Sequence, residues 1–88
     1  MTDLTSAQRD ALIDAHRSIN HGGLIEVAGA SGTVWVGQHP DCDVEYRPHV
    51  IREIKELGLI DWIGRPFMRT AHINDLGLLE IDLAGLAA

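Results

Sequence analysis

The spacing of apolar residues predicts which parts of the chain are helical. A first helix is expected over residues 5 to 19, because one face repeats apolar side chains at helical spacing while Asp14 lies elsewhere around the wheel. Thr5 followed by Gln8 has the form of a capping box, and Asn20-His21-Gly22-Gly23 supplies glycines of the kind on which helices often end. The apolar face comprises Ala11, Leu12, Ala15 and Ile19.

Extended structure is predicted for the next segment. Two β-favouring runs, residues 24 to 28 and 33 to 36, are separated by a glycine-containing loop, which is typical of a hairpin. Residues 37 to 46, GQHPDCDVEY, have no helical period and alternate acidic side chains, which favours an exposed loop or an edge strand. We therefore expect that segment at the surface.

A second helix is predicted to begin at Pro48, which suits a first helical turn, and to end at Gly58. Its opposite face is polar and mixed in sign, with Arg52 and Glu56 spaced for an i,i+4 pair. The apolar stripe comprises Val50, Ile51, Ile54 and Leu57.

The pattern becomes extended again after this helix. Residues 59 to 63 and 67 to 73 flank a Gly-Arg-Pro turn, which predicts a two-stranded flap. Ala71 and Ile73 are two residues apart, so their side chains lie on the same face of the strand, which we expect to face the core. By its spacing Arg69 belongs to the same face, so it lies beyond the edge of the core or breaks the register.

The C-terminal segment is predicted to be a helix capped by Asn74 or Asp75. Leu78 and Ile81 lie off its apolar stripe, so the helix carries more apolar surface than one face needs. Such a surplus predicts a homodimer through this helix. The stripe comprises Leu76, Leu79, Leu83 and Leu86.

Length and composition limit the classes of protein that remain. A chain of 88 residues has room for one domain, so we expect residues 1 to 88 to form a single unit. No apolar run approaches the roughly 18 residues of a spanning helix, and the N-terminus lacks the order of a signal peptide. Cys42 has no second cysteine to pair with, which fits a reducing compartment. A cytoplasmic protein without membrane contact is predicted.

Charge is distributed unevenly along the chain. The net charge is -6, yet five of the seven lysine and arginine residues lie between residues 46 and 73, which hold only three acidic residues. Nucleic-acid binding depends on cations that neutralise phosphates. The segment from 46 to 73 is therefore the part of the chain suited to it.

The stretches EIKELGLIDW, residues 53 to 62, and RTAHINDLG, residues 69 to 77, resemble a known family. They are similar to the winged helix-turn-helix DNA-binding domain of bacterial regulators such as the multiple-antibiotic-resistance regulators, over about residues 47 to 80. The resemblance implies a small α+β domain in the order helix, β-hairpin, helix, two-stranded wing, helix. It also implies a recognition helix in the major groove and a basic wing. The DNA contacts implied are Arg47, His49, Arg52, Lys55, Arg65 and Arg69.

The chain departs from that family in two places. A hairpin and an acidic loop stand where the family has the helix before the recognition helix. Glu53 and Glu56 lie on the reading face, where a glutamate accepts from a cytosine amine but gives nothing to the phosphate backbone.

Two functions remain open from the sequence. The first is a dimeric, non-enzymatic protein that binds double-stranded DNA and regulates transcription without a cofactor. The second is an acidic protein-interaction module, such as an anti-CRISPR-like inhibitor encoded by a phage or mobile element, that binds a nucleic-acid-binding protein. The second would use Asp41, Asp43 and Glu45, because acidic residues outside the basic segment outnumber basic ones by ten to two.

Catalytic and metal chemistry have weak support in the sequence. The ligand-type side chains His39, Cys42, Asp43 and His49 have the spacing of only a poor zinc motif, so no metal is predicted. Cys42 has no signature of a general base or an oxyanion donor, so no catalytic residue is predicted. Each of the two predicted hairpins carries one tryptophan, and both are expected to pack in the core.

Overall fold

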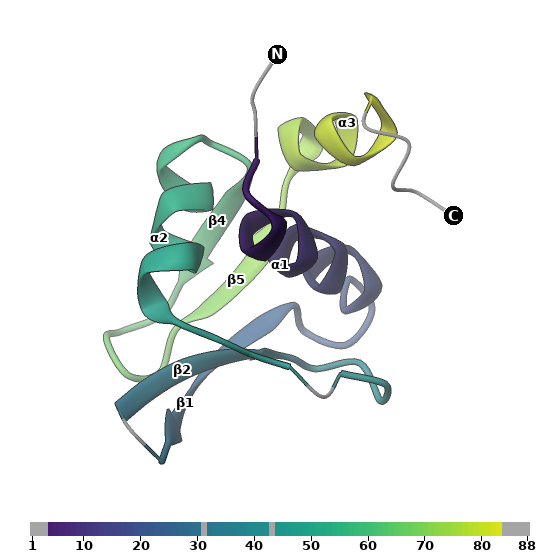
Figure 1. The fold of residues 1–88 in the computed structure, drawn as a ribbon. Helices are drawn as coiled ribbons and strands as arrows, with labels where there is room; N and C mark the ends of the chain where they lie inside the picture. The colour runs from purple at the N-terminus through teal and green to yellow at the C-terminus, as the bar shows by residue number, and fades with distance from the viewer. Residues whose placement is uncertain (1–3, 31, 43, 84–88) are drawn as a thin grey trace.

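The computed structural model describes residues 4 to 30, 32 to 42 and 44 to 83. These residues form an α+β domain, which confirms the predicted class, with three helices and one antiparallel sheet (Figure 1). The elements are α1 (Ser6–Arg17), β1 (Leu24–Gly29), β2 (Gly32–Gly37), β3 (Glu45–Tyr46), α2 (Pro48–Glu56), β4 (Ile60–Ile63), β5 (Thr70–Ile73) and α3 (Asp75–Leu83).

The five strands lie in the order β3-β2-β1-β5-β4. The β1–β2 hairpin is the longer one, paired from Leu24↔Gly37 to Gly29↔Gly32. The β4–β5 hairpin pairs from Ile60↔Ile73 to Ile63↔Thr70. Only Leu24↔Ala71 and Ile25↔Thr70 join β1 to β5. The predicted flap is therefore the end of a continuous sheet, held to the first hairpin by a short ladder.

The helices cover one face of the sheet (Figure 1). Alternate strand residues point toward them, among them Leu24, Trp35 and Ala71, each at most 1% exposed. The opposite face is only half-buried and is lined in β1 and β2 by Ile25, Val27, Val34 and Val36. Among the described residues, no helix has the length and apolarity needed to cross a bilayer.

The first helix begins as predicted and ends earlier. The Gln8 N–H donates to Thr5 Oγ1 and the Thr5 N–H donates to Gln8 Oε1, which confirms the capping box. The helix stops at Arg17, and Ile19 is 50% exposed, so its place in the apolar stripe was wrong. Asp14, expected on the polar face, is buried because it has partners outside the helix.

The segment from 37 to 46 differs from its prediction as surface. β3 is an edge strand, as one of the two predicted alternatives, and Glu45 is exposed. His39 and Tyr46, however, are 7% and 5% exposed, because both turn inward to the carboxylate of Asp14. The alternation of acidic side chains indicated the edge strand but not the burial of His39 and Tyr46 on either side of that alternation.

The second helix agrees with its pattern over most of its length. Pro48 occupies its first turn, and Gly58, with φ +80°, ends it in the left-handed region that favours glycine. Leu57 is the C-cap and 44% exposed, so it was wrongly assigned to the buried stripe. Arg52 and Glu56 are both exposed, and within residues 44 to 83 no ion pair joins them.

The last helix turns residues off its predicted apolar stripe toward the core. The side chain of Asn74 accepts from the Gly77 N–H at 2.9 Å, which confirms the cap. Ile81, which lies off the predicted stripe, is 1% exposed, whereas Leu76 and Leu79 of that stripe are 58% and 51% exposed. The reason is Gly77, which is buried against Leu59 so closely that a Cβ there would overlap the Leu59 carbonyl oxygen.

That contact turns residues 77, 78 and 81 toward the core, and Leu78 packs against it. The other two members of the predicted stripe cannot be compared, because Leu86 and the side chain of Leu83 lie outside the described residues.

Candidate functional site

An aromatic ring lies where α2 meets the β4–β5 hairpin. Trp62 of β4 stacks on the buried Trp35, with ring centroids 5.7 Å apart and planes inclined by 25°. Lys55 Nζ of α2 lies 4.8 Å from the Trp62 ring centroid, and Arg69 Cζ lies 4.1 Å from it. Both distances are within the range of a cation–π interaction. A cation from the helix and a cation from the hairpin therefore converge on one indole, which we call the tryptophan junction.

The Arg69 guanidinium is also held by a buried carboxylate. Arg69 Nη2 donates to Glu26 Oε2 at 3.1 Å, and the Glu26 side chain is 3% exposed. Burial raises the pKa of Glu26, but the hydrogen bonds and charge of Arg69 outweigh it and hold that pKa below its ordinary value of 4.5. Arg69 lies at the edge of the core, the first of the two predicted alternatives, and Glu26 offsets part of its charge.

The exposed face of α2 carries cations on one side and acidic residues on the other. At 3.6 residues per turn, Lys55 and Arg52 lie about 60° apart around the helix, and Glu53 lies about 100° from Arg52 in the opposite direction. The contact of Lys55 with Trp62 fixes the side that faces the hairpin. The half of α2 near the hairpin is therefore cationic, and the far half carries His49, Glu53 and Glu56, all exposed.

The start of α2 carries two more of the predicted contacts. Arg47 is the N-cap and its side chain makes no capping hydrogen bond. Arg47, Pro48 and His49 line an open surface groove of about 530 Å³ that is shared with Glu45. A helix N-terminus favours anions, and the added guanidinium strengthens this field, whereas the Glu45 carboxylate opposes it.

The tip of the β4–β5 hairpin combines a cation with apolar side chains. Arg65 is exposed, and its carbonyl accepts from the Met68 N–H at 2.9 Å. Phe67 has φ +69°, which is unusual for a bulky residue, and Phe67 and Met68 are each 76% exposed. This apolar tip was not predicted, although the residues GRPFM of the turn contain the signal.

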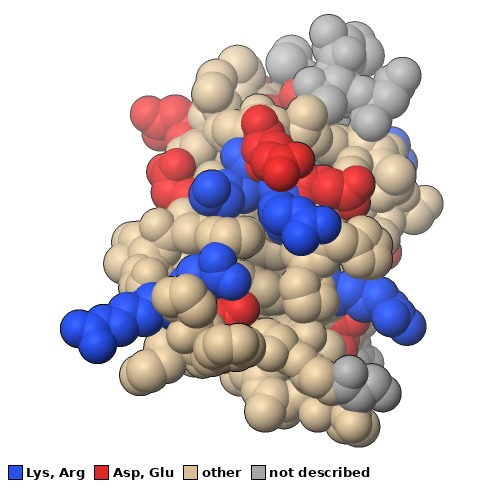
Figure 2. Space-filling view, turned by 90° about the vertical axis from the view of Figure 1, so that its left-hand side faces the viewer, with Lys and Arg blue, Asp and Glu red and all other residues tan. Residues whose placement is uncertain are grey.

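On the face that carries α2, lysine and arginine side chains stand at several places, with acidic side chains between those in the upper half (Figure 2). Of the six predicted DNA contacts, two meet at the tryptophan junction and Arg52 neighbours one of them on α2. Arg47 and His49 lie at the helix start, and Arg65 lies at the hairpin tip. The cations thus share a region without forming a continuous patch.

A second polar group lies between α1 and the loop that follows β2. His39 Nε2 and Asp14 Oδ1 are 2.8 Å apart, and the Tyr46 hydroxyl donates to Asp14 Oδ2. Burial and the Asp14 carboxylate raise the pKa of Tyr46, so its hydroxyl stays protonated and donates. Cys42 lies beside the pair. We call these four residues the buried polar cluster.

The sequence had grouped His39 and Cys42 with other ligand-type residues. The structure brings them together with Asp14 instead, whereas His49 is exposed on α2. Asp43 lies outside the described residues, and its neighbours Asp41 and Glu45, also proposed for a protein partner, are exposed.

Comparison with protein-family models, with curated proteins and with solved structures found no match. The function is therefore inferred from the residues of this chain.

Proposed function

We propose that the protein binds double-stranded DNA through α2 and the β4–β5 hairpin and acts as a small transcription regulator. The observation that carries the proposal is the tryptophan junction, where Lys55 and Arg69 lie over one ring. Cations from a helix and from an adjoining hairpin can follow a phosphate backbone only if they lie on a common surface.

The dimensions of α2 suit the role of a recognition helix. Nine residues give a length of about 13 Å, comparable to the roughly 12 Å width of the major groove. With α2 in the groove, its cationic half faces the hairpin, and Arg65 at the hairpin tip is carried toward the adjacent backbone.

The charge distribution also limits the strength of binding. Glu53 and Glu56 on the far half of α2, and Glu26 beside Arg69, reduce the field that phosphates meet. Four exposed cations remain as phosphate contacts, namely Arg47, Arg52, Lys55 and Arg65. A plot of log affinity against log salt concentration is then expected to have a slope of about -3 to -4.

Fluorescence anisotropy with a labelled mixed-sequence duplex tests this proposal. The affinity of the wild type should fall steeply with added salt, and Arg52→Ala combined with Arg65→Ala should flatten the slope by about two units. The matched control is Arg9→Ala combined with Arg17→Ala, which removes the same charge from exposed positions of α1. Equal effects of the two double variants, or no binding at low salt, would contradict the proposal.

The proposal includes a homodimer through α3, supported by the exposed Leu76 and Leu79. Sedimentation equilibrium should report a dimer for the wild type and a monomer for the variant with serine at both positions. A wild type that remains monomeric at all concentrations would remove the dimer from the proposal.

A second candidate function is binding of a protein partner through the acidic loop. Asp41 and Glu45 are exposed, while His39 and Tyr46 on the same segment are buried, so both carboxylates stand on an anchored backbone. A pull-down from host lysate should recover a nucleic-acid-binding protein with the wild type and lose it with Asp41→Lys combined with Glu45→Lys. Recovery that is unaffected by this charge reversal would contradict the second candidate.

A further inference from the structure

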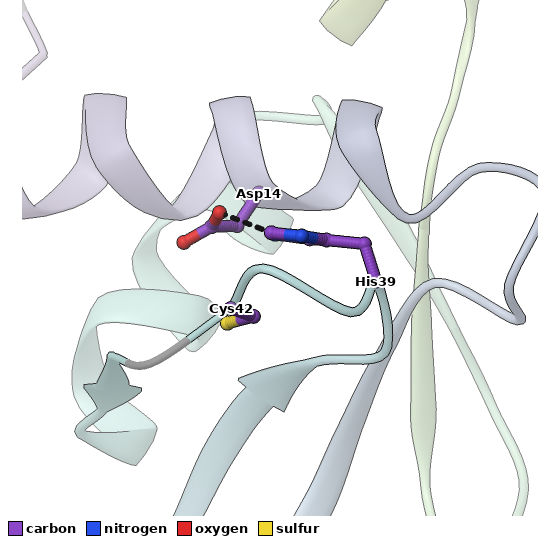
Figure 3. A group of neighbouring side chains, drawn as sticks. All are labelled: Asp14, His39 and Cys42. Atoms are coloured by element: carbon purple, nitrogen blue, oxygen red, sulfur yellow. Dashed lines mark hydrogen bonds and ion pairs between the residues drawn. The ribbon is translucent and has the colours of Figure 1, made fainter.

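Three side chains of metal-ligating type meet between α1 and the loop that follows β2. Asp14 projects from α1, and His39 and Cys42 come from the loop (Figure 3). One oxygen of Asp14, one ring nitrogen of His39 and Cys42 Sγ all lie within 4.8 Å of one another. Asp14 is separated from His39 by 25 residues, so a contact between distant parts of the chain brings these atoms together.

The separations are close to those that a zinc ion needs. Zinc bonds of about 2.0 Å to nitrogen or oxygen and 2.3 Å to sulfur place tetrahedral ligand atoms roughly 3.3 to 3.6 Å apart. The His39 and Asp14 atoms, now 2.8 Å apart, would separate by about half an ångström, and Sγ, which lies within 4.8 Å of both, would approach by at most about 1.3 Å. Side-chain rotations supply shifts of that size without a change of fold.

The donor set also selects the metal. One thiolate, one imidazole and one carboxylate form a mixed sulfur, nitrogen and oxygen set, which suits zinc and not the all-oxygen preference of calcium or magnesium. The His39 and Asp14 side chains are only 5% and 12% exposed, so the ion would be held largely out of water.

Two of the three side chains, Asp14 and Cys42, have an outer partner, and His39 is held through its backbone. The Tyr46 hydroxyl donates to the Asp14 oxygen that does not face His39, and the Gly37 N–H donates to Cys42 Sγ at 3.2 Å. The His39 backbone N–H donates to Ser18 Oγ at 3.2 Å, which anchors the loop to the end of α1. Such outer hydrogen bonds orient the ligands of metal sites and tune their affinity.

A route for an ion to enter also exists. A surface pocket of about 270 Å³ is lined by Asp14, Cys42 and Tyr46, so two of the three ligands border solvent-accessible space. That pocket leaves room for a water molecule as the fourth ligand.

We propose that Asp14, His39 and Cys42 form a zinc site whose fourth position opens into this pocket. The ion fastens the loop that follows β2 to α1. The site is independent of the DNA-binding face, because none of its residues belongs to α2 or to the β4–β5 hairpin.

Titration of the metal-free protein with Co²⁺ tests the site, because a thiolate bound to cobalt absorbs in the near ultraviolet and tetrahedral cobalt absorbs strongly in the visible. Cys42 is the only cysteine, so the ultraviolet band reports this residue alone. We expect both bands to saturate at one equivalent of Co²⁺ and to disappear when one equivalent of Zn²⁺ is added.

Cys42→Ser is the main variant, since it changes one atom of a side chain that is only partly buried. It should remove the ultraviolet band, weaken Zn²⁺ binding by about tenfold or more, and abolish the rise in melting temperature that Zn²⁺ gives the wild type. His49→Gln is the matched control. The sequence placed His49 among the ligand-type residues with Cys42, but His49 lies on α2, so this variant should bind Zn²⁺ as the wild type does.

Absence of both absorption bands in the wild type would overturn the proposal, as would a Zn²⁺ affinity that is the same in Cys42→Ser. His39→Gln and Asp14→Asn should also weaken binding, and circular dichroism of each variant checks that the fold is retained.

Discussion

The tryptophan junction and the buried polar cluster are both built from charged and polar groups, but they differ in how those groups are paired. At the junction, Lys55 remains exposed and Arg69 is only partly offset by Glu26. In the buried polar cluster, Asp14 accepts from Tyr46 and pairs with His39 inside the protein. At the tryptophan junction, charged side chains therefore remain accessible to a partner from solution. In the buried polar cluster, the charged and polar side chains serve the fold or the proposed ion.

This difference separates two kinds of consequence for mutation. Removing a member of the buried cluster leaves a buried polar group without its partner in the protein. Removing Lys55 at the junction leaves mainly exposed surface, where effects on stability are small. Substitutions at the two regions should therefore change different measured quantities.

The largest effect on stability is expected for Asp14→Ala. It removes the partner of both His39 and Tyr46, and two buried polar groups left unpaired cost about 2 to 5 kcal/mol together. Urea denaturation monitored by circular dichroism measures the loss. Asp10→Ala, an exposed change one turn earlier on α1, should stay within about 0.5 kcal/mol. Similar losses for the two variants would mean that the cluster does not support the fold.

A smaller and pH-dependent effect is expected for Glu26→Gln. Because the pKa of Glu26 is lowered in the folded protein, its ionised form stabilises the fold above pH 4.5, and that contribution is lost as the pH falls through the folded pKa. At pH 7 the variant should be about 1 to 2 kcal/mol less stable, as expected for loss of a charged hydrogen bond. Denaturation at a series of pH values should show the difference shrinking toward acid.

Glu26→Gln also connects stability with binding. It removes the charge that offsets Arg69, so the variant should bind duplex DNA more tightly at low salt although it is less stable. Anisotropy of the folded variant at pH 7 gives the comparison. Unchanged affinity would place Arg69 outside the DNA-binding face.

The smallest effect on stability is expected for Lys55→Gln. Loss of one exposed cation–π contact with Trp62 costs about 0.5 to 1 kcal/mol. The effect of Lys55→Gln on DNA binding should be easier to measure, because the loss of one phosphate contact lowers the slope of log affinity against log salt concentration by about one unit. Glu53→Gln on the far half of α2 is the control and should not reduce the slope. A stability loss as large as that of Asp14→Ala would erase the distinction between the two regions.

Local patterns in the sequence were sufficient for most of the fold. The capping box of Thr5, the start of α2 at Pro48 and the cap at Asn74 each depend on residues close in the chain, and all three predictions are confirmed. The two-residue spacing of Ala71 and Ile73 also predicted their burial correctly. Side chains alternate between the two faces of a strand whichever elements pack against it.

The errors arose where a distant contact decided the outcome. The orientation of α3 is set by the fit of Gly77 against Leu59, which no helical wheel contains. The buried polar cluster escaped detection because Asp14 is separated by 25 residues from His39 and by 32 from Tyr46. By contrast, the local charge pattern singled out Lys55 and Arg69, although it did not predict that both lie over Trp62, which was expected to pack in the core.

The measurement that tests the central claim most directly is a ¹⁵N–¹H correlation NMR titration of the labelled protein with duplex DNA. DNA binding through α2 and the β4–β5 hairpin predicts amide shift changes concentrated in residues 47 to 56 and 60 to 70, with the loop from residue 38 to 42 unchanged. The opposite distribution, or a spectrum that does not change at low salt, would contradict the account.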